Sequence, residues 1–163
     1  MTSKAEWLAL AKRCENATGS DRELDTLIGV AINLHPDGAF PLRETVPLYK
    51  TSAEFAADNA ERYTSIWRTA LPRYTASLDA ITALIERDLP GWMIRVQWCG
   101  VSAEAWVAPD LNDGGCPQIY RDNAERWHDY AERNEVEIRP GSREAAIRAL
   151  CAAFCRAMSE KAA

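Results

Sequence analysis

The stretch GWMIRVQW, residues 91–98, decides the fold because it carries the strongest strand pattern in the chain. Aromatic and branched side chains alternate along it with Arg95 and Gln97, as expected for a strand that buries one face. A second run of this kind, AEAWVAP at 103–109, follows after a short connection and predicts an antiparallel hairpin. Residues 135–139 have the composition of a third strand.

Three of the six tryptophans lie in this predicted hairpin. We expect Trp92, Trp98 and Trp106 to pack between the sheet and the helices, because large aromatic side chains supply much of the buried area of a core. Tryptophans that form a stacking surface for a nucleotide would give the same sequence pattern. Both interpretations stay open at this point.

Four segments around these strands have the pattern of helices. Each begins at serine, aspartate or threonine residues that can accept a hydrogen bond from a free N–H of the first turn, and the last three have apolar residues at helical spacing. The segments cover residues 3–16, 20–34, 77–89 and 142–158. Together with the strands they predict an α+β fold, in which an antiparallel sheet of three to four strands packs against amphipathic helices.

The composition is that of one ordinary globular domain. A chain of 163 residues can bury a core without metal or disulfides, so residues 1–163 are expected to form a single domain. The net charge of -5 argues against binding of extended nucleic acid, which needs a surplus of lysine and arginine. No run has the length of a signal-peptide core or a membrane span, which favours a cytoplasmic protein without membrane contact. Five cysteines without a CxxC pair favour reduced thiols.

The five letters DNAER occur twice, at 58–62 and at 122–126. Asp and Asn commonly start helices, and Glu in the first turn complements the helix dipole, so two similar helix starts explain the repeat. A second interpretation uses the ring after each copy, Tyr63 and Trp127, because an arginine beside a flat ring can hold a phosphate and a stacked base. The repeat therefore predicts helix starts and leaves open whether they flank one ligand pocket.

Known catalytic motifs are absent from the sequence. It contains no nucleophile elbow, P-loop, glycine-rich dinucleotide loop or HExxH motif, and its two histidines are His35 and His128. Cys151 and Cys155 lie one helical turn apart, but no nearby histidine or further thiol completes a tetrahedral metal site, so we expect buried core thiols. The sequence predicts a protein that is not an enzyme and uses no cofactor or metal. Carboxylates clustered beside His128 in the fold would favour an enzyme instead.

The segment 67–77 has the best pattern for ligand binding. Two arginines, two aromatic residues and three hydroxyl residues precede a predicted helix start, where free N–H groups and the helix dipole favour an anion such as phosphate. The alternative is a capping turn with Tyr74 packed on the sheet. The predicted ligand contacts are Trp67, Arg68, Arg73, Tyr74, Thr75 and Ser77, with Trp127 as a further stacking residue.

Four stretches of the chain match a known sequence pattern in the right order. They are SDRELDTLIGVAI at 20–32, LPRYTASLDAITALI at 71–85, GWMIRV at 91–96 and EVEIRPGSREAAIRALCAAFCRAM at 135–158. In these residues the chain resembles the small phage and prophage proteins of the phage alpha-beta-alpha sandwich domain family, which show an ELD-x-L helix, a P-x-Y-(S/T) turn, a GW strand start and an ALCxA closing helix. The resemblance implies a viral context and a small non-enzymatic, sandwich-like fold. Residues 35–66 and 116–133 depart from the family pattern as insertions.

Two functions of different classes fit this pattern. The leading hypothesis is a phage anti-defence sponge that sequesters a nucleotide-derived immune signal in the host cytosol, since sequestration needs arginines, aromatic rings and capped helix starts but no catalytic group. The alternative is a protein-protein interaction module that inhibits a host or viral protein, which exposed apolar residues in the segment 39–55 would favour. A homo-oligomer is compatible with the sequence, which does not fix the oligomeric state.

Overall fold

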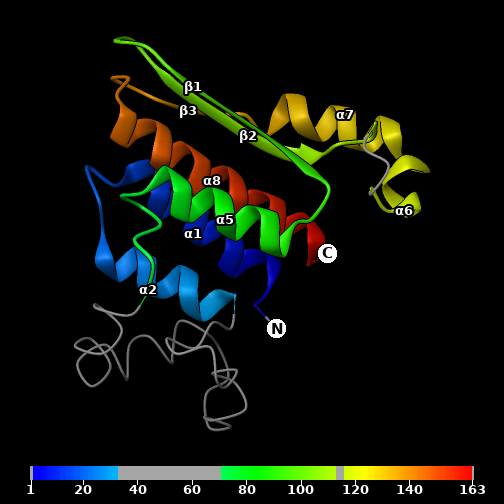
Figure 1. Ribbon diagram of the computed structural model, residues 1–163, viewed down its shortest axis with the longest axis horizontal. Helices are drawn as coiled ribbons and strands as arrows, with labels where there is room; N and C mark the ends of the chain where they lie inside the picture. The colour runs from blue at the N-terminus through cyan, green and yellow to red at the C-terminus, as the bar shows by residue number, and fades with distance from the viewer. Residues whose placement is uncertain (1, 33–70, 113–115, 163) are drawn as a thin grey trace, which may run out of the picture.

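The structure is a computed structural model, and it describes residues 2–32, 71–112 and 116–162. Figure 1 labels the helices and strands of these residues. In chain order they are α1 (Lys4–Asn16), α2 (Arg22–Ala31), α5 (Leu78–Asp88), β1 (Trp92–Trp98), β2 (Ala103–Pro109), α6 (Gln118–Arg121), α7 (Ala124–Arg133), β3 (Val136–Ile138) and α8 (Arg143–Lys161). Every strand that the sequence predicts is present.

The three strands form one antiparallel sheet in the order β1-β2-β3. β1 and β2 pair along their whole lengths, from Trp92 opposite Pro109 to Trp98 opposite Ala103. β3 pairs with the first residues of β2, so that Ala103 also lies opposite Ile138. The sheet packs against helices, which confirms the predicted α+β fold and the predicted hairpin.

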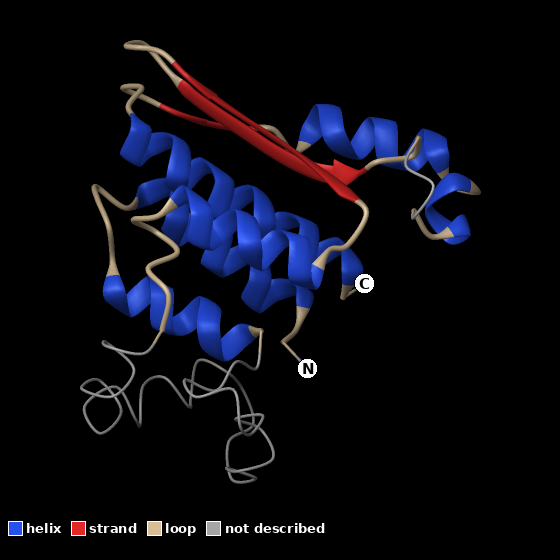
Figure 2. Ribbon diagram, in the orientation of Figure 1, coloured by secondary structure: helices blue, strands red, loops and turns tan. Residues whose placement is uncertain are grey.

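The two faces of the sheet have different surroundings. Figure 2 shows α1, α2, α5 and α8 together on one side of it. The sheet residues that face these helices are buried and belong to one continuous apolar core, and they include Ala103, Ala105, Val107, Val136 and Ile138. Because side chains alternate along a strand, the residues between them point to the opposite face. This opposite face is called the outer face below.

The closing helix α8 lies at the centre of the core. Thirteen of its nineteen residues are buried, so it is covered on most sides rather than on the one face that the sequence predicts. The α1 helix packs along it, with the rings of Trp7 and Phe154 meeting edge to face at 5.9 Å between centroids. α8 is the longest described helix, and neither it nor any other of them has the apolar length needed to cross a membrane.

A buried carboxylate ties the start of α2 to the turn before α5. Asp25 has no exposed surface, and its Oδ1 accepts a hydrogen bond from the backbone N–H of Thr75 at 2.7 Å. Its Oδ2 accepts one from Nη1 of Arg22 at 3.0 Å. Burial raises the pKa of the Asp25 carboxyl, because loss of water outweighs these hydrogen bonds. The same Arg22 donates from Nη2 to the carbonyl of Leu71. The ion pair therefore binds the turn at two places, at Leu71 through Arg22 and at Thr75 through Asp25.

Asp25→Ala should lower the free energy of unfolding by about 3 kcal/mol, because it leaves the Thr75 N–H buried without an acceptor and removes the ion-pair partner of Arg22. The measurement is urea denaturation at neutral pH. Glu23→Ala is the matched control, since Glu23 is an exposed carboxylate on the same helix and its loss should change stability by less than about 0.5 kcal/mol. Equal losses in the two variants would show that the buried contacts of Asp25 contribute nothing.

Candidate functional site

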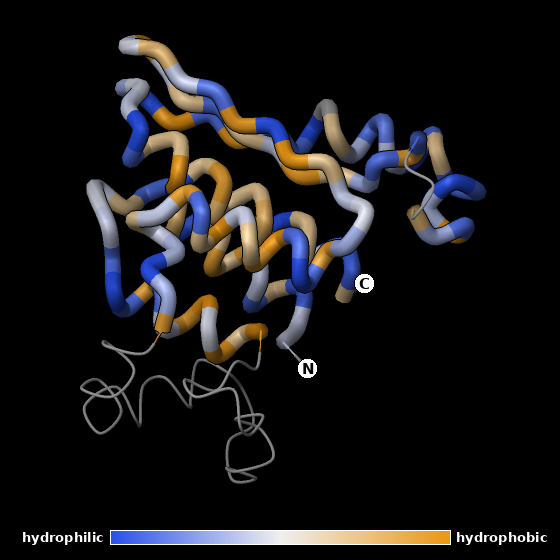
Figure 3. Tube along the Cα trace, in the orientation of Figure 1, coloured by the Kyte–Doolittle hydropathy of each residue, from blue (hydrophilic) through white to orange (hydrophobic). Residues whose placement is uncertain are grey.

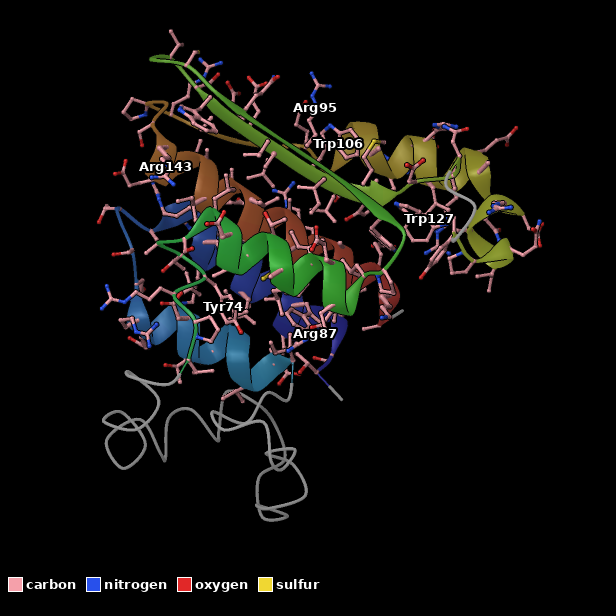
Figure 4. The ribbon with its side chains drawn as sticks, viewed as in Figure 1. Tyr74, Arg87, Arg95, Trp106, Trp127 and Arg143 are labelled. Atoms are coloured by element: carbon pink, nitrogen blue, oxygen red, sulfur yellow. The ribbon has the colours of Figure 1, made fainter. Side chains whose placement is uncertain are left out.

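Tyr74, a predicted ligand contact, is part of the core. Its side chain is 2% exposed, and burial raises the pKa of its hydroxyl to about 12. Its backbone carbonyl accepts a hydrogen bond from the thiol of Cys151 at 3.3 Å, which joins the turn to α8. Figure 4 shows Tyr74 among the helices, on the side of the sheet that they cover. The ring therefore packs in the interior and offers no face to a ligand in this conformation.

Thr75 and Ser77 use their hydroxyl groups inside the protein. The Oγ1 of Thr75 accepts a hydrogen bond from the N–H of Asp21 at 2.9 Å. The Oγ of Ser77 accepts one from the N–H of Ala80 at 3.2 Å and so caps α5. Of the two interpretations of this segment, the capping turn is the one that these contacts support.

Arg73 is the exposed residue among the five predicted contacts that the structure describes. Its carbonyl accepts hydrogen bonds from the N–H groups of Ala76 and Ser77, which fixes the turn while the side chain stays in solvent. Trp67 and Arg68 lie outside the described residues. The arrangement of the predicted anion site is therefore that of a capped, closed turn beside one solvated arginine.

Trp127, the seventh predicted contact, lies on α7 in a buried aromatic cluster. It is 6% exposed and contacts three rings edge to face, with centroids at 5.2 to 5.5 Å. These rings belong to Trp92, Tyr120 and Tyr130. Figure 4 places Trp127 well apart from Tyr74. The structure thus does not bring Trp127 together with the turn at Tyr74, and the ring is already fully packed.

The second DNAER copy starts α7, but by different contacts from those expected. Asn123 occupies the N-cap position without a side-chain capping bond, and its side chain donates instead to the carbonyl of Ile119 at 2.8 Å. Arg126 forms an ion pair with Glu160 at 3.1 Å and lies over the ring of Trp127. Both members of the proposed cation-ring pair are used within the fold. The first copy, at 58–62, lies outside the described residues.

The buried cysteines are core residues. Cys14, Cys151 and Cys155 are inaccessible to solvent, as expected for Cys151 and Cys155 from the sequence. Burial raises the pKa of the Cys151 and Cys155 thiols well above the ordinary value, which keeps them protonated and unreactive. Within the part of the chain that the structure describes, no group of three His, Cys, Asp or Glu residues is placed to hold a metal ion.

The outer face of the sheet gathers an unusual set of side chains. Met93 is 44% exposed, and Arg95 and Gln97 follow it as exposed residues on β1. Trp106 on β2 is half-buried and lies directly opposite Arg95, so the two side chains point to the same face. Figure 4 shows Arg95 on the side of the sheet away from α1, α2, α5 and α8, where α7 also lies toward one end of the strands. Figure 3 shows the alternation of hydrophilic and hydrophobic residues along the strands.

The predicted packing of the hairpin tryptophans is confirmed for one of the three. Trp92 is buried, with 9% of its surface exposed. Trp98 is 46% exposed because β1 continues beyond the helices that cover the middle of the sheet, and the prediction for it is wrong. Trp106 is half-buried and packs against the core, but the register places it on the outer face, opposite α1, α2, α5 and α8.

Arg95 lacks a carboxylate partner among the described residues. Its one hydrogen bond is to Oε1 of Gln97 at 3.4 Å, and no acidic side chain described in the structure comes within ion-pair distance. The nearest acids on this face have other partners. Hydrogen bonds from Gln97 and Ser102 lower the pKa of Glu104, and Glu137 pairs with Arg139 at 2.7 Å. A solvated arginine beside an indole ring and a thioether is therefore the site that the geometry assembles.

Sequence reasoning missed this site, although a signal for it existed. A hairpin with β1 and β2 joined through residues 99–102 has a fixed register, and that register puts Arg95 opposite Trp106. The predicted ligand contacts lie at helix starts instead. Comparison with protein family models, with curated proteins and with solved structures found no match for this chain. The resemblance to phage sandwich proteins consequently stays a prediction.

Trp127→Ala should lower the free energy of unfolding by about 3 to 5 kcal/mol, because it opens a cavity inside the aromatic cluster. Trp106→Ala is the matched control and should cost about 1 kcal/mol, since that indole is only half-buried on the outer face. Urea denaturation of the two variants beside the parent protein measures both. A small loss for Trp127→Ala would mean that this ring is available for stacking after all.

Cys99 should be the fast-reacting thiol of the native protein. It is exposed in the β1–β2 connection, whereas the other four cysteines are buried. Hydrogen bonds from the backbone N–H groups of Ser102 and Val101 lower the pKa of its thiol, so the reactive thiolate persists to lower pH than in an unstructured peptide. The rate of reaction with a disulfide reagent, followed against pH, checks this. Cys99→Ser should remove the fast phase, and a fast phase that survives this change would contradict the assignment.

Proposed function

We propose that this chain is a non-enzymatic binding protein that contacts another protein through the outer face of its sheet. The observation that carries the proposal is the group on the β1–β2 hairpin in which Met93 and Arg95 are exposed and Trp106 is half-buried. Arginine, tryptophan and methionine are the residue types enriched at protein interfaces, and arginine and tryptophan dominate the residues that contribute most to binding. This function is the protein-interaction alternative of the two that the sequence allows.

The charge of the face indicates the chemistry of the partner. Arg95 is without a carboxylate partner in the described residues, while Glu104 and Glu137 are already hydrogen-bonded within the face. A partner that presents a carboxylate next to an apolar side chain would pair with the guanidinium and cover Met93 and Trp106. The proposed partner is therefore a protein with an acidic residue flanked by apolar ones.

The biological setting of the proposal comes from the resemblance to small phage and prophage proteins. In that setting the partner is a host or viral protein met in the cytosol of the infected cell, and binding blocks its action. Blocking by occupation needs no nucleophile, general base or metal. The proposal thus agrees with a sequence that contains none of the known catalytic motifs.

Sequestration of a nucleotide signal has weaker support in the geometry. Tyr74, Thr75 and Trp127 are buried, and the Ser77 hydroxyl is bound to the N–H of Ala80. Arg73 alone of the five described contacts is exposed. The sponge function stays a prediction, and recovery of an intact nucleotide at near-stoichiometric yield from the heated, purified protein would return it to first place.

The proposal is tested by placing a photo-crosslinking amino acid at Met93 and irradiating bacterial cells that express the protein. The expected product is one discrete adduct, and mass spectrometry should locate the crosslink on the partner beside an aspartate or glutamate. Leu8 on α1 is the matched control position, because it is also 44% exposed but lies on a helix away from the outer face. Equal crosslinking from both positions would show non-specific contact and would refute the proposal.

Arg95→Glu should reduce the yield of the Met93 crosslink by about tenfold or more, because the variant carboxylate repels the acidic residue of the partner. Arg143→Glu changes the charge of an exposed arginine at the start of α8, outside the sheet, and should have little effect. An unchanged yield for Arg95→Glu would remove the proposed charge complementarity.

A further inference from the structure

One edge of the sheet, along β1, carries backbone groups that pair with no other strand among residues 2–32, 71–112 and 116–162. The N–H of Asp110 donates to the carbonyl of Gly91, and the N–H of Cys99 donates to the carbonyl of Ser102. In an antiparallel pair, hydrogen-bonded and non-hydrogen-bonded residue pairs alternate, so the odd-numbered residues of β1 bond to β2. The backbone N–H and C=O groups of the even-numbered residues Ile94, Val96 and Trp98 therefore point away from β2.

This edge lacks the features that usually protect an edge strand. β1 spans seven residues without proline, lysine or a bulge, and Arg95 is its one charged residue. Trp98 at its end is 46% exposed, and Ile94 and Val96 are half-buried on the face toward the helices. A long, apolar strand edge that no described strand pairs with is a template for another strand.

We propose that this edge pairs with a second copy of the chain, with the two β1 strands antiparallel about a two-fold axis at Val96. The hydrogen-bonded pairs across the axis are then Val96 with Val96, and Ile94 with Trp98, in both directions. Both pairs are apolar and lie on the face toward the helices, so the pairing extends the core of each copy across the axis. When the sequence Ile-Arg-Val-Gln-Trp at 94–98 pairs antiparallel with itself about Val96, apolar residues lie opposite apolar ones and polar residues opposite polar ones.

The register is chosen by charge. Pairing about Arg95, the middle residue of β1, would place two guanidinium groups directly opposite each other, which is unfavourable. Pairing about Val96 shifts the strands so that Arg95 of one copy faces Gln97 of the other. This pair is already compatible within one strand, where Arg95 donates to Gln97 Oε1 at 3.4 Å.

The α5 helix supplies a second self-complementary pattern. It contacts β1 and runs beneath it in Figure 1, so a two-fold axis at the edge also brings the α5 helices of both copies toward each other. Asp79, Ala83 and Arg87 are exposed and follow one another at intervals of one helical turn. In an antiparallel arrangement about Ala83, Asp79 of one copy faces Arg87 of the other, whose guanidinium also pairs with Asp88 of its own chain at 2.7 Å.

The dimer would have a continuous six-stranded sheet. Its two outer faces would lie on one surface, which presents the group around Arg95 twice. Pairing of one strand edge and one helix per copy lies at the small end of stable interfaces, so we expect a dimer that dissociates on dilution. This inference does not rest on the proposed function, because the edge and the outer face are separate surfaces of β1.

Sedimentation equilibrium over a range of concentrations tests the inference. At about 100 μM the parent protein should have twice the chain mass of 18.2 kDa, since a dimer with a Kd of ~1 μM is then almost fully formed. Val96→Pro should be monomeric, because it removes an outward N–H while leaving the bonds to β2 intact. Val96→Thr keeps that N–H and the branched shape and should still dimerise. A monomeric parent protein at this concentration would overturn the proposal.

Further variants test the same pairing without introducing a proline, which could disturb the strand by itself. Trp98→Lys changes an exposed residue and places a charge opposite Ile94 of the other copy, so it should also give a monomer while circular dichroism shows the native fold. In a Cys99→Ser background, Val96→Cys treated with diamide as the two-electron oxidant should form an intermolecular disulfide, because paired Cα atoms lie about 5.5 Å apart. Ile94→Cys should not, since its copies are about 14 Å apart in this register. Crosslinking of Ile94→Cys with none of Val96→Cys would refute the register.

The two proposals can fail separately. Trp106→Ala lies on β2, away from the edge, and should leave the sedimentation of the protein unchanged while it weakens the Met93 crosslink to a partner. Val96→Pro should instead change the sedimentation of the protein from that of a dimer to that of a monomer. Loss of dimerisation in Trp106→Ala would contradict the assignment of the edge as the self-association surface.

Discussion

The burial of α8 on most of its sides is the constraint on which the rest of the structure depends. Six alanines and two cysteines of this helix are buried, and side chains this small let α1 and the sheet approach it closely from different directions. A helix covered in this way must have a neighbour on each side. The positions of α1, α5 and the inner face of the sheet are therefore set by their contacts with one element near the end of the chain.

The polar interior is concentrated where the helices meet the turn at Tyr74. The turn receives Asp25 and Arg22 from α2 and the thiol of Cys151 from α8, so three contacts from two separate helices fix its backbone. Keeping the Asp25 charge out of water is unfavourable, as the raised pKa of its carboxyl indicates. Its contribution is positional, because a buried carboxylate with two fixed donors allows one arrangement of the turn against α2.

Local chemistry explains which features of the fold the sequence could predict. The capping box of Ser3 and Glu6, the cap of Ser142 and the alternation along 91–98 each depend on residues a few positions apart, and all occur in the structure. The hairpin follows from two alternating runs and a short connection. The fold class was predictable because these local signals agree with one another.

The candidate ligand site could not be predicted in the same way, because its residues serve two purposes that look alike in sequence. Hydroxyl groups before a helix start can bind a ligand or cap the helix, and the choice depends on distant partners. The partner of the Thr75 hydroxyl, Asp21, is 54 residues earlier in the chain. Trp127 is similar, since its burial depends on Trp92 from another element. Neither contact has a periodic signal along the chain.

The outer face of the sheet has a composition that stability alone does not explain. An antiparallel sheet with one covered face is expected to place polar residues on the other, and Gln97, Glu104 and Glu137 follow this rule. The exposed Met93 and the half-buried Trp106 depart from it, although apolar surface left in solvent adds little to the core and increases the tendency to aggregate. These two residues flank an arginine that forms no ion pair with a described carboxylate, although its charge adds to the hydrogen bond from Gln97 in lowering the pKa of Glu104. The position of Met93 and Trp106 is explained if a partner protein covers the outer face. The apolar edge of β1 is explained in the same way if a second copy of the chain pairs with it.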